Sequence, residues 1–116
     1  MTIDRIGPGP INTRVVVHNN VAYLSGLVAD DKSAGMADQT KQILAKIDKH
    51  LADAGTNKSR LLSATVYLSD MSRKSEMNEV WSAWIDPANP PARTTVGVEL
   101  SSPETLIEIT VTAAIV

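Results

Sequence analysis

The sequence contains no cysteine and no phenylalanine, and only two tryptophans and two tyrosines occur among its 116 residues. The lack of cysteine excludes a disulfide scaffold, thiolate chemistry and any metal held by cysteine. Four large aromatic side chains are also few for a protein that stacks nucleic-acid bases. The composition therefore excludes disulfide-rich and thiol-dependent proteins and argues against a protein that stacks bases.

The sequence also lacks a basic block and a long apolar run. Eleven basic and 13 acidic residues give a formal net charge of −2, which argues against a nucleic-acid partner. No segment approaches the length of a membrane span, and Met1–Arg5 has no apolar core resembling a signal peptide. We expect a soluble, cytoplasmic protein with no membrane contact.

The two histidines, His18 and His50, have no further histidine or carboxylate at ligand spacing, so no metal site is predicted. We also expect no cofactor. His18 is interpreted as a solvated turn residue and His50 as a partly buried structural one. No Gly-x-Ser-x-Gly motif supports a serine hydrolase.

A chain of this length suits one domain over residues 1–116, with a limited core that self-association would extend. Hydrophobic periodicity predicts an α+β fold, one mixed sheet with both helices on one face. We expect Gly7–Pro10 to break regular structure, Ser72 to cap the second helix, and Asp86-Pro87 to end it. The predicted order is strand, strand, helix, strand, helix, strand, strand, over residues 15–17, 21–24, 36–54, 61–68, 72–85, 95–100 and 106–115.

The sheet face opposite the helices has an unusual predicted composition. Alternation assigns Leu62, Ala64, Val66 and Leu68, with Ile107, Ile109, Val111, Ala113 and Ile115, to the helix side. The other side receives Ser63, Thr65 and Tyr67, with Glu108, Thr110, Thr112, Ala114 and Val116. A solvated face would carry many Lys and Glu residues, whereas small uncharged side chains suit a surface covered by another copy of the chain. We therefore expect an oligomer.

Arg93 and Glu108 are the strongest candidates for chemistry. Pro90-Pro91 stiffens the chain just before Arg93, and a held guanidinium suits bidentate capture of a carboxylate. Glu108 lies inside an apolar strand, an unusual place for an acid. The two residues are interpreted as halves of a small-molecule site, although a solvated arginine and a surface acid remain an alternative. Asn78 is either exposed or lines a cleft, and Trp81 and Trp84 are interpreted as core residues.

These residues belong to a set of motifs that resembles the Rid family, also called the YjgF or reactive-intermediate deaminase family. The likeness covers nearly the whole chain. Pro-Ala-Arg followed at this distance by a glutamate within a strand is quite specific. The motifs are Tyr23-Leu24-Ser25-Gly26, Thr65-Val66-Tyr67-Leu68-Ser69-Asp70-Met71, Met77-Asn78-Glu79-Val80-Trp81, Pro91-Ala92-Arg93 and Ile107-Glu108-Ile109.

The resemblance implies a chorismate-mutase-like α+β fold and a homotrimer with clefts between subunits. It also implies hydrolysis of enamines and imines, such as 2-aminoacrylate and 2-iminopropionate, to 2-keto acids and ammonia. By the same resemblance, Arg93 holds the substrate carboxylate and Glu108 positions water and moves protons. Ser25 and Asn78 are placed at the cleft in supporting roles.

Two cleft positions depart from the family pattern. Asn12 stands where many members carry the tyrosine of Gly-Pro-Tyr-Ser, and Thr95 replaces a cysteine often found two residues after the arginine. These changes keep open a second hypothesis, a trimer that binds a small carboxylate without turnover. A third, an endoribonuclease or holdase-type interaction protein, is disfavoured by the acidic balance of the chain.

Overall fold

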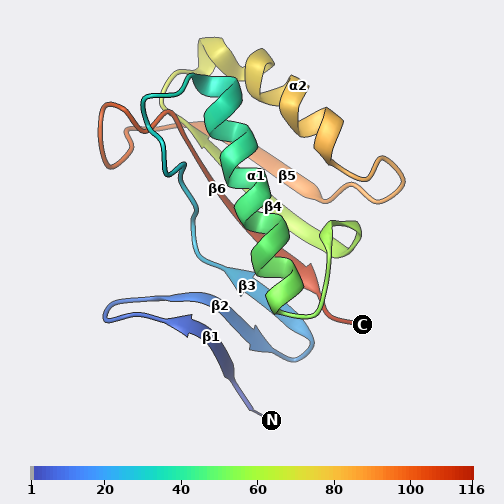
Figure 1. Ribbon diagram of the computed structural model, residues 1–116. Helices are drawn as coiled ribbons and strands as arrows, with labels where there is room; N and C mark the ends of the chain where they lie inside the picture. Colours follow the sequence, from blue (N-terminus) through green and yellow to red (C-terminus); the bar gives the residue numbers. More distant parts are fainter. Residues whose placement is uncertain (1) are drawn as a thin grey trace.

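The computed structural model describes residues 2–116. One six-stranded sheet, in the order β1-β2-β3-β6-β4-β5, is covered on one face by two helices (Figure 1). The predicted α+β architecture is thus confirmed. The elements are β1 (Asp4–Pro8), β2 (Thr13–His18), β3 (Val21–Leu24), α1 (Met36–Asp53), β4 (Leu61–Leu68), α2 (Lys74–Trp84), β5 (Ala92–Gly97) and β6 (Ile107–Ala114), with short 3-10 turns at Lys58–Arg60 and Met71–Arg73. All strand pairs are antiparallel except β4–β5, which α2 connects in parallel.

The first strand corrects the expectation that Gly7–Pro10 breaks regular structure. Residues Asp4–Pro8 form β1, which pairs with β2 along the edge of the sheet. Proline is compatible with this position because Pro8 ends an edge strand, where a missing N–H donor costs little. Gly7 adopts a φ of 69°, which a glycine accepts without strain.

The turn between β2 and β3 matches the predicted hairpin. Asn19 and Asn20 have φ values of 53° and 62°, the left-handed conformation of a two-residue type I′ turn. Asparagine tolerates this conformation better than most residues, which explains the Asn-Asn pair.

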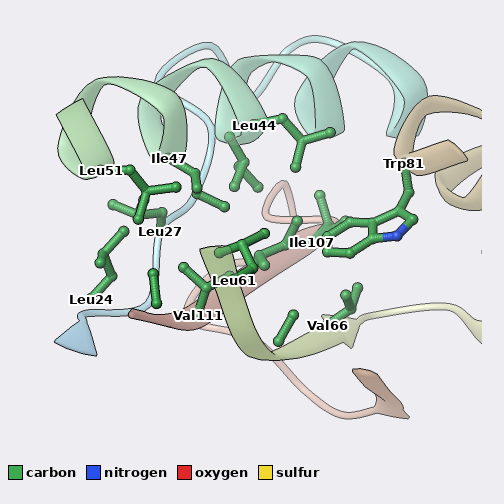
Figure 2. Close-up of a cluster of buried hydrophobic side chains, with 14 of the residues drawn as sticks. Leu24, Leu27, Leu44, Ile47, Leu51, Leu61, Val66, Trp81, Ile107 and Val111 are labelled. Atoms are coloured by element: carbon green, nitrogen blue, oxygen red, sulfur yellow. The ribbon is translucent and has the colours of Figure 1, made fainter. Parts of the chain in front are cut away.

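The hydrophobic core lies between the sheet and the helices (Figure 2). On α1, Ile43, Leu44, Ile47 and Leu51 are buried as the periodicity predicts. On β6, every second residue from Ile107 to Ala113 is buried against them. This alternation confirms which face of β6 is covered.

A buried glutamine holds the start of α1 against the start of β6. Gln39 is fully buried, and its Nε2 donates to the carbonyl oxygens of Ala34 (3.0 Å) and Glu104 (3.0 Å). Its Oε1 accepts from the Leu106 amide at 3.1 Å. Because both ends of the amide are satisfied, the polar side chain joins three backbone segments without leaving an unpaired group.

The pattern predicted for β4 is wrong at one residue. Leu61 is 6% exposed whereas Leu62 is 47% exposed, although alternation assigned Leu62 to the helix side. The register with β6 shifts between Leu61 and Ser63, so a bulge inserts one residue. From Ala64 onward the predicted alternation holds.

Two further boundaries differ from prediction. Ser72 does not cap α2; instead the carboxylate of Asp70 accepts the Ser72 amide (3.0 Å) and caps the 3-10 turn that leads into the helix. The strand predicted over 95–100 begins earlier, at Ala92, directly after the proline pair, and Arg93 therefore lies inside β5. Within residues 2–116, no helix combines the length and apolar character needed to cross a bilayer.

Candidate functional site

Arg93 lies on the helix-covered side of β5, at the edge of the sheet. Its register partner on β4 is Ala64, which is 3% exposed beneath the helices. Paired residues on neighbouring strands share a face, so the Arg93 side chain rises toward α2. Two features fix the backbone at Arg93: the parallel pairing of β5 with β4, and the two prolines just before β5.

Three α2 side chains hold the guanidinium of Arg93. Its Nη2 donates to Asn78 Oδ1 at 2.7 Å, and its Nη1 contacts the Met77 sulfur at 3.7 Å. Its Cζ lies 5.2 Å from the centroid of the Trp81 ring, within cation–π range. Because a guanidinium only donates, the amide oxygen of Asn78 must face it. Side chains one turn apart on α2 therefore determine the direction of the arginine.

The charge of Arg93 is partly desolvated, and no acidic side chain pairs with it within residues 2–116. Burial lowers the pKa of the guanidinium from its usual range. The ion pairs found within residues 2–116 are Lys46–Asp30, Lys49–Asp53 and Arg73–Glu76, none of which includes Arg93. An oriented, half-buried cation without a counter-ion is suited to receive an external carboxylate.

Glu108 lies on the opposite face of the sheet. It is the second residue of β6 and pairs with Tyr67 of β4, between the buried residues Ile107 and Ile109. Glu108 is half-buried, and no ion pair to it is found in the part of the chain that the structure describes. Its face is not covered by a helix (Figure 1).

Gly26 gives the Glu108 carboxylate room to lie against the backbone. A Cβ at Gly26 would overlap Glu108 Oε2 and lie 3.0 Å from its Cδ. The pairing with β6 also shifts by one residue between Tyr23–Thr112 and Leu27–Ile109, so an extra residue is inserted at Ser25-Gly26. This irregularity brings the glycine, rather than a side chain, next to the acid.

A single chain thus carries two separate groups of candidate residues. Asn78 contacts Arg93, and Thr95 lies on the same side of β5, in register with the buried Val66. Ser25 lies beside Gly26, and its amide donates to the Arg14 carbonyl at 3.0 Å. We call the set Arg93, Asn78, Trp81 and Thr95 the arginine cluster, and the set Glu108, Ser25 and Gly26 the glutamate cluster.

Asn12 belongs to neither cluster within one chain. It is exposed in the turn between β1 and β2, where its carbonyl accepts the Gly9 amide at 2.7 Å. This turn lies at the sheet edge opposite β5. The role expected for Asn12 in a cleft wall therefore stays a prediction that depends on a second copy of the chain.

Sequence reasoning missed the contributions of Trp81 and Gly26. Trp81 was interpreted as a core residue, and at 7% exposure it is one, yet its ring also supports Arg93. The signal was the spacing of Asn78 and Trp81, which lie three residues apart and so face the same side of the helix that precedes the strand of Arg93. For Gly26, the signal was a glycine next to a strand end, a common site of close backbone approach.

Among the residues that the structure describes, no group of three histidine or carboxylate side chains lies close enough to hold a metal ion. His50, predicted to be partly buried, is buried at 8% exposure, whereas His18, interpreted as a solvated turn residue, is the half-buried last residue of β2. Neither histidine belongs to the two clusters described above.

The chain is similar to known proteins over nearly its full length. The model of the family described as Endoribonuclease L-PSP matches residues 3–115. A RutC family protein from Haemophilus influenzae is 41% identical over 97% of this chain and 98% of its own length. The RutC family protein YoaB from Escherichia coli is 39% identical over 99% of this chain and all of its own.

The chain also resembles a solved structure in both fold and sequence. The crystal structure of a YjgF family member from Neisseria meningitidis superimposes with a TM-score of 0.95 at 38% identity, covering all of this chain and 97% of that one. Sequence and fold match over the same full length. The chain therefore belongs to the YjgF/Rid family, whose model bears the description Endoribonuclease L-PSP.

Proposed function

We propose that this protein hydrolyses reactive 2-imino acids of the 2-aminoacrylate/2-iminopropionate type to 2-keto acids and ammonia, in clefts between the subunits of a homotrimer. The observation that supports this most is Arg93: a half-buried guanidinium, aimed by Asn78 and Trp81, with no acidic partner within residues 2–116. A 2-imino acid carries the carboxylate that such a group binds.

The proposed cleft requires two chains because Arg93 and Glu108 lie on opposite faces of the sheet. β5 is an edge strand, so a neighbouring copy can approach Arg93 from outside. The uncovered face bearing Glu108 is rich in threonine and serine and suits contact with another copy. In the trimer, the arginine cluster of one subunit would face the glutamate cluster of the next.

The reaction itself needs few groups. As Glu108 takes a proton from water, the oxygen bonds to C2 of the iminium and the C=N electron pair moves to nitrogen. Glu108 then gives its proton to the nitrogen of the resulting carbinolamine. The C–N bond breaks as the hydroxyl oxygen forms the C=O bond and passes its proton to Glu108, which releases ammonia and the 2-keto acid. An enamine substrate first gains a proton at C3. One carboxyl group that accepts and returns a proton is sufficient for these steps.

The two clusters divide this work. Arg93 fixes the substrate carboxylate, so water attacks a carbon held in place, and such orientation is worth up to several kcal/mol of the barrier. Met77 and Trp81 reduce the access of water to the guanidinium and so strengthen its attraction for an anion. Glu108 supplies the proton transfers, which typically contribute about 10²–10⁴-fold.

The test is ammonia release from 2-iminopropionate generated by a dehydratase. We expect Arg93→Ala mainly to raise KM and Glu108→Gln mainly to lower kcat by about 10²-fold or more. Arg73→Ala and Glu104→Gln are matched controls, because Arg73 pairs with Glu76 at the surface and Glu104 is exposed. Full activity in Arg93→Ala, or no acceleration by the native protein on small and bulky imino acids alike, would overturn the proposal.

A second candidate is a trimer that binds a small carboxylate without turnover. It is favoured by the chemistry around Arg93, since Asn78, Trp81 and Thr95 of the arginine cluster and the neighbouring Met77 supply no acid or base for proton transfer. This alternative predicts carboxylate binding that depends on Arg93, no turnover, and little effect of Glu108→Gln on affinity. Calorimetry with pyruvate on the same variants separates the two candidates.

A further inference from the structure

A polar hollow lies between the start of β2, the segment after β3 and the second half of α1. It has a volume of about 320 Å³ and is lined by Arg14, Leu27, Asp30, Lys46, Lys49 and His50. Neither Arg93 nor Glu108 takes part in it. We propose that this hollow binds a phosphate-type oxyanion, either inorganic phosphate or the phosphate of a small metabolite.

Positive charge exceeds negative charge around this hollow. Lys46 pairs with Asp30 at 3.0 Å and Lys49 with Asp53 at 3.1 Å, and both acids lie largely at the surface. Arg14 forms no ion pair within residues 2–116. The two carboxylates offset two of the three cations, and the charge of Arg14 is left over, so the hollow keeps a net positive charge that attracts an anion.

His50 is a buried titratable group at the same place. It is 8% exposed, and burial is the main reason why its pKa lies below the ordinary value. Arg14 of β2 and Lys49 and Lys46 of α1 lower the pKa further, whereas Asp53 opposes them. An oxyanion in the hollow would reverse this balance, because it favours the protonated imidazole.

The number of donors favours a tetrahedral oxyanion over a carboxylate. Arg14 offers up to five N–H groups, each lysine three, and protonated His50 two. They reach the hollow from a strand and from successive turns of a helix. The two oxygens of a carboxylate lie in one plane with its carbon, whereas the four oxygens of phosphate or sulfate point in tetrahedral directions and suit donors that come from several sides.

The hollow also borders the segment that carries Gly26. The Arg14 carbonyl accepts the Ser25 amide at 3.0 Å, and Lys46 Nζ donates to the Val28 carbonyl at 2.9 Å. Leu27 lines the hollow and pairs with Ile109, the residue after Glu108. A bound oxyanion would thus stabilise the backbone against which the Glu108 carboxylate lies.

The chain offers a direct test because it contains only two histidines. Sulfate is the first probe, since it has the shape of phosphate and does not titrate near neutral pH. At constant ionic strength set with chloride, we expect sulfate to raise the NMR titration midpoint of His50 by roughly half a unit to one unit. His18, the last residue of β2, does not line the hollow, so its signal should not respond to sulfate.

Two variants and a control locate the effect. Lys49→Gln and Arg14→Gln should each abolish the sulfate-dependent shift of His50, whereas Lys41→Gln, which removes a charge elsewhere on α1, should leave it. Native-like chemical shifts elsewhere establish that the variants fold, and Lys49, 72% exposed in its side chain, is the safer of the two. Equal shifts of both histidines, no shift, or a shift that survives Lys49→Gln would each overturn the proposal.

Titration with inorganic phosphate and with glycerol phosphate then distinguishes the two sources of the oxyanion. Binding of either one in the same His50 assay supports the site, and the tighter ligand identifies its class. Acetate at equal ionic strength should produce no shift. If acetate shifts His50 as strongly as sulfate does, the preference for a tetrahedral oxyanion is wrong.

Discussion

The two faces of the sheet differ in how completely other parts of the same chain bury their side chains. On the face toward α1 and α2, side chains such as Ile107 and Ile109 are fully buried and pack into a continuous core. On the other face, Thr65, Tyr67, Thr110 and Thr112 are only half-buried, although none of them carries a charge. The helices of the same chain bury the side chains of the covered face. The uncovered face, by contrast, has the composition of a surface that another molecule contacts.

The same contrast separates the two clusters. Arg93 is held by three side chains of its own subunit, while Glu108 lies on the uncovered face with the Gly26 backbone close against its carboxylate. The arginine cluster is thus organised before assembly. We expect the glutamate cluster to become functional only when a neighbouring subunit covers it.

The largest effect is expected from a charge placed on the uncovered face. Thr65→Lys puts an ammonium group among half-buried threonines of β4 and β6, where contact with another subunit would desolvate it. We expect loss of the trimer and of imine hydrolysis while the monomer stays folded, as measured by sedimentation and circular dichroism. Ser82→Lys, on the exposed side of α2, is the control. A trimeric, active Thr65→Lys protein would contradict the proposed assembly.

Adjacent residues of β6 compare the two faces directly. Ile109→Ala should cost about 3 kcal/mol of the free energy of unfolding, because a fully buried side chain leaves a cavity. Thr110→Ala should cost only about 1 kcal/mol, mainly the hydrogen bond from its hydroxyl to the Leu24 carbonyl. Urea unfolding at one protein concentration measures both. Equal costs would show that the uncovered face is as well packed as the core.

Within the glutamate cluster, Gly26→Ala should separate activity from folding. The added methyl group would overlap Glu108 Oε2 and displace the carboxylate, so we expect kcat to fall about a hundredfold. The melting temperature should change little. Gly35→Ala is the control, since its Cβ would meet nothing closer than Arg73 Nη2 at 4.0 Å. Unchanged kcat in Gly26→Ala would exclude Glu108 as the group that moves protons.

The arginine cluster is tested by a substitution that places a carboxylate of the protein itself beside Arg93. Asn78→Asp places an acid beside Arg93 Nη2, where it competes with the substrate carboxylate. We expect KM to rise roughly tenfold with kcat little changed, which marks a loss of binding common to ground and transition states. Ser82→Asp adds the same charge on the exposed side of α2 and should have no effect. Unaltered KM in Asn78→Asp would place the substrate elsewhere.

The smallest effect concerns pH. Because burial lowers the pKa of His50 below its ordinary value of 6.5, the unfolded chain binds more protons than the folded one as pH falls through that value. The free energy of unfolding should therefore decrease on acidification in this window. His50→Gln should remove the decrease and His18→Gln should leave it, as measured by thermal unfolding across the range. If the free energy of unfolding depends on pH in the same way in His50→Gln, His50 is not the group responsible for the decrease.

Much of the fold could be predicted because periodicity reports directly on burial. The apolar stripe of α1 and the alternation of β6 identified the core side correctly, and the Asn19-Asn20 turn required the left-handed backbone that asparagine tolerates. Prediction failed at β1, where an edge strand accepts Pro8, and at Leu62, where a bulge changes which side chain is buried. The bulge depends on pairing with β6, which is distant in the sequence and leaves no mark on the local pattern of β4, and β1 forms by pairing with β2 across the turn that follows it.

The candidate site divides in the same way. Proline rigidity, strand position and family motifs identified Arg93, Glu108 and Asn78 from the sequence, because residue type and local backbone determine their chemistry. Only the tertiary structure showed that Arg93 and Glu108 point to opposite faces, that Trp81 supports the guanidinium, and that Gly26 makes room for the acid. The physical reason is that strand register and helix packing, which join residues far apart in the chain, decide which functional groups meet.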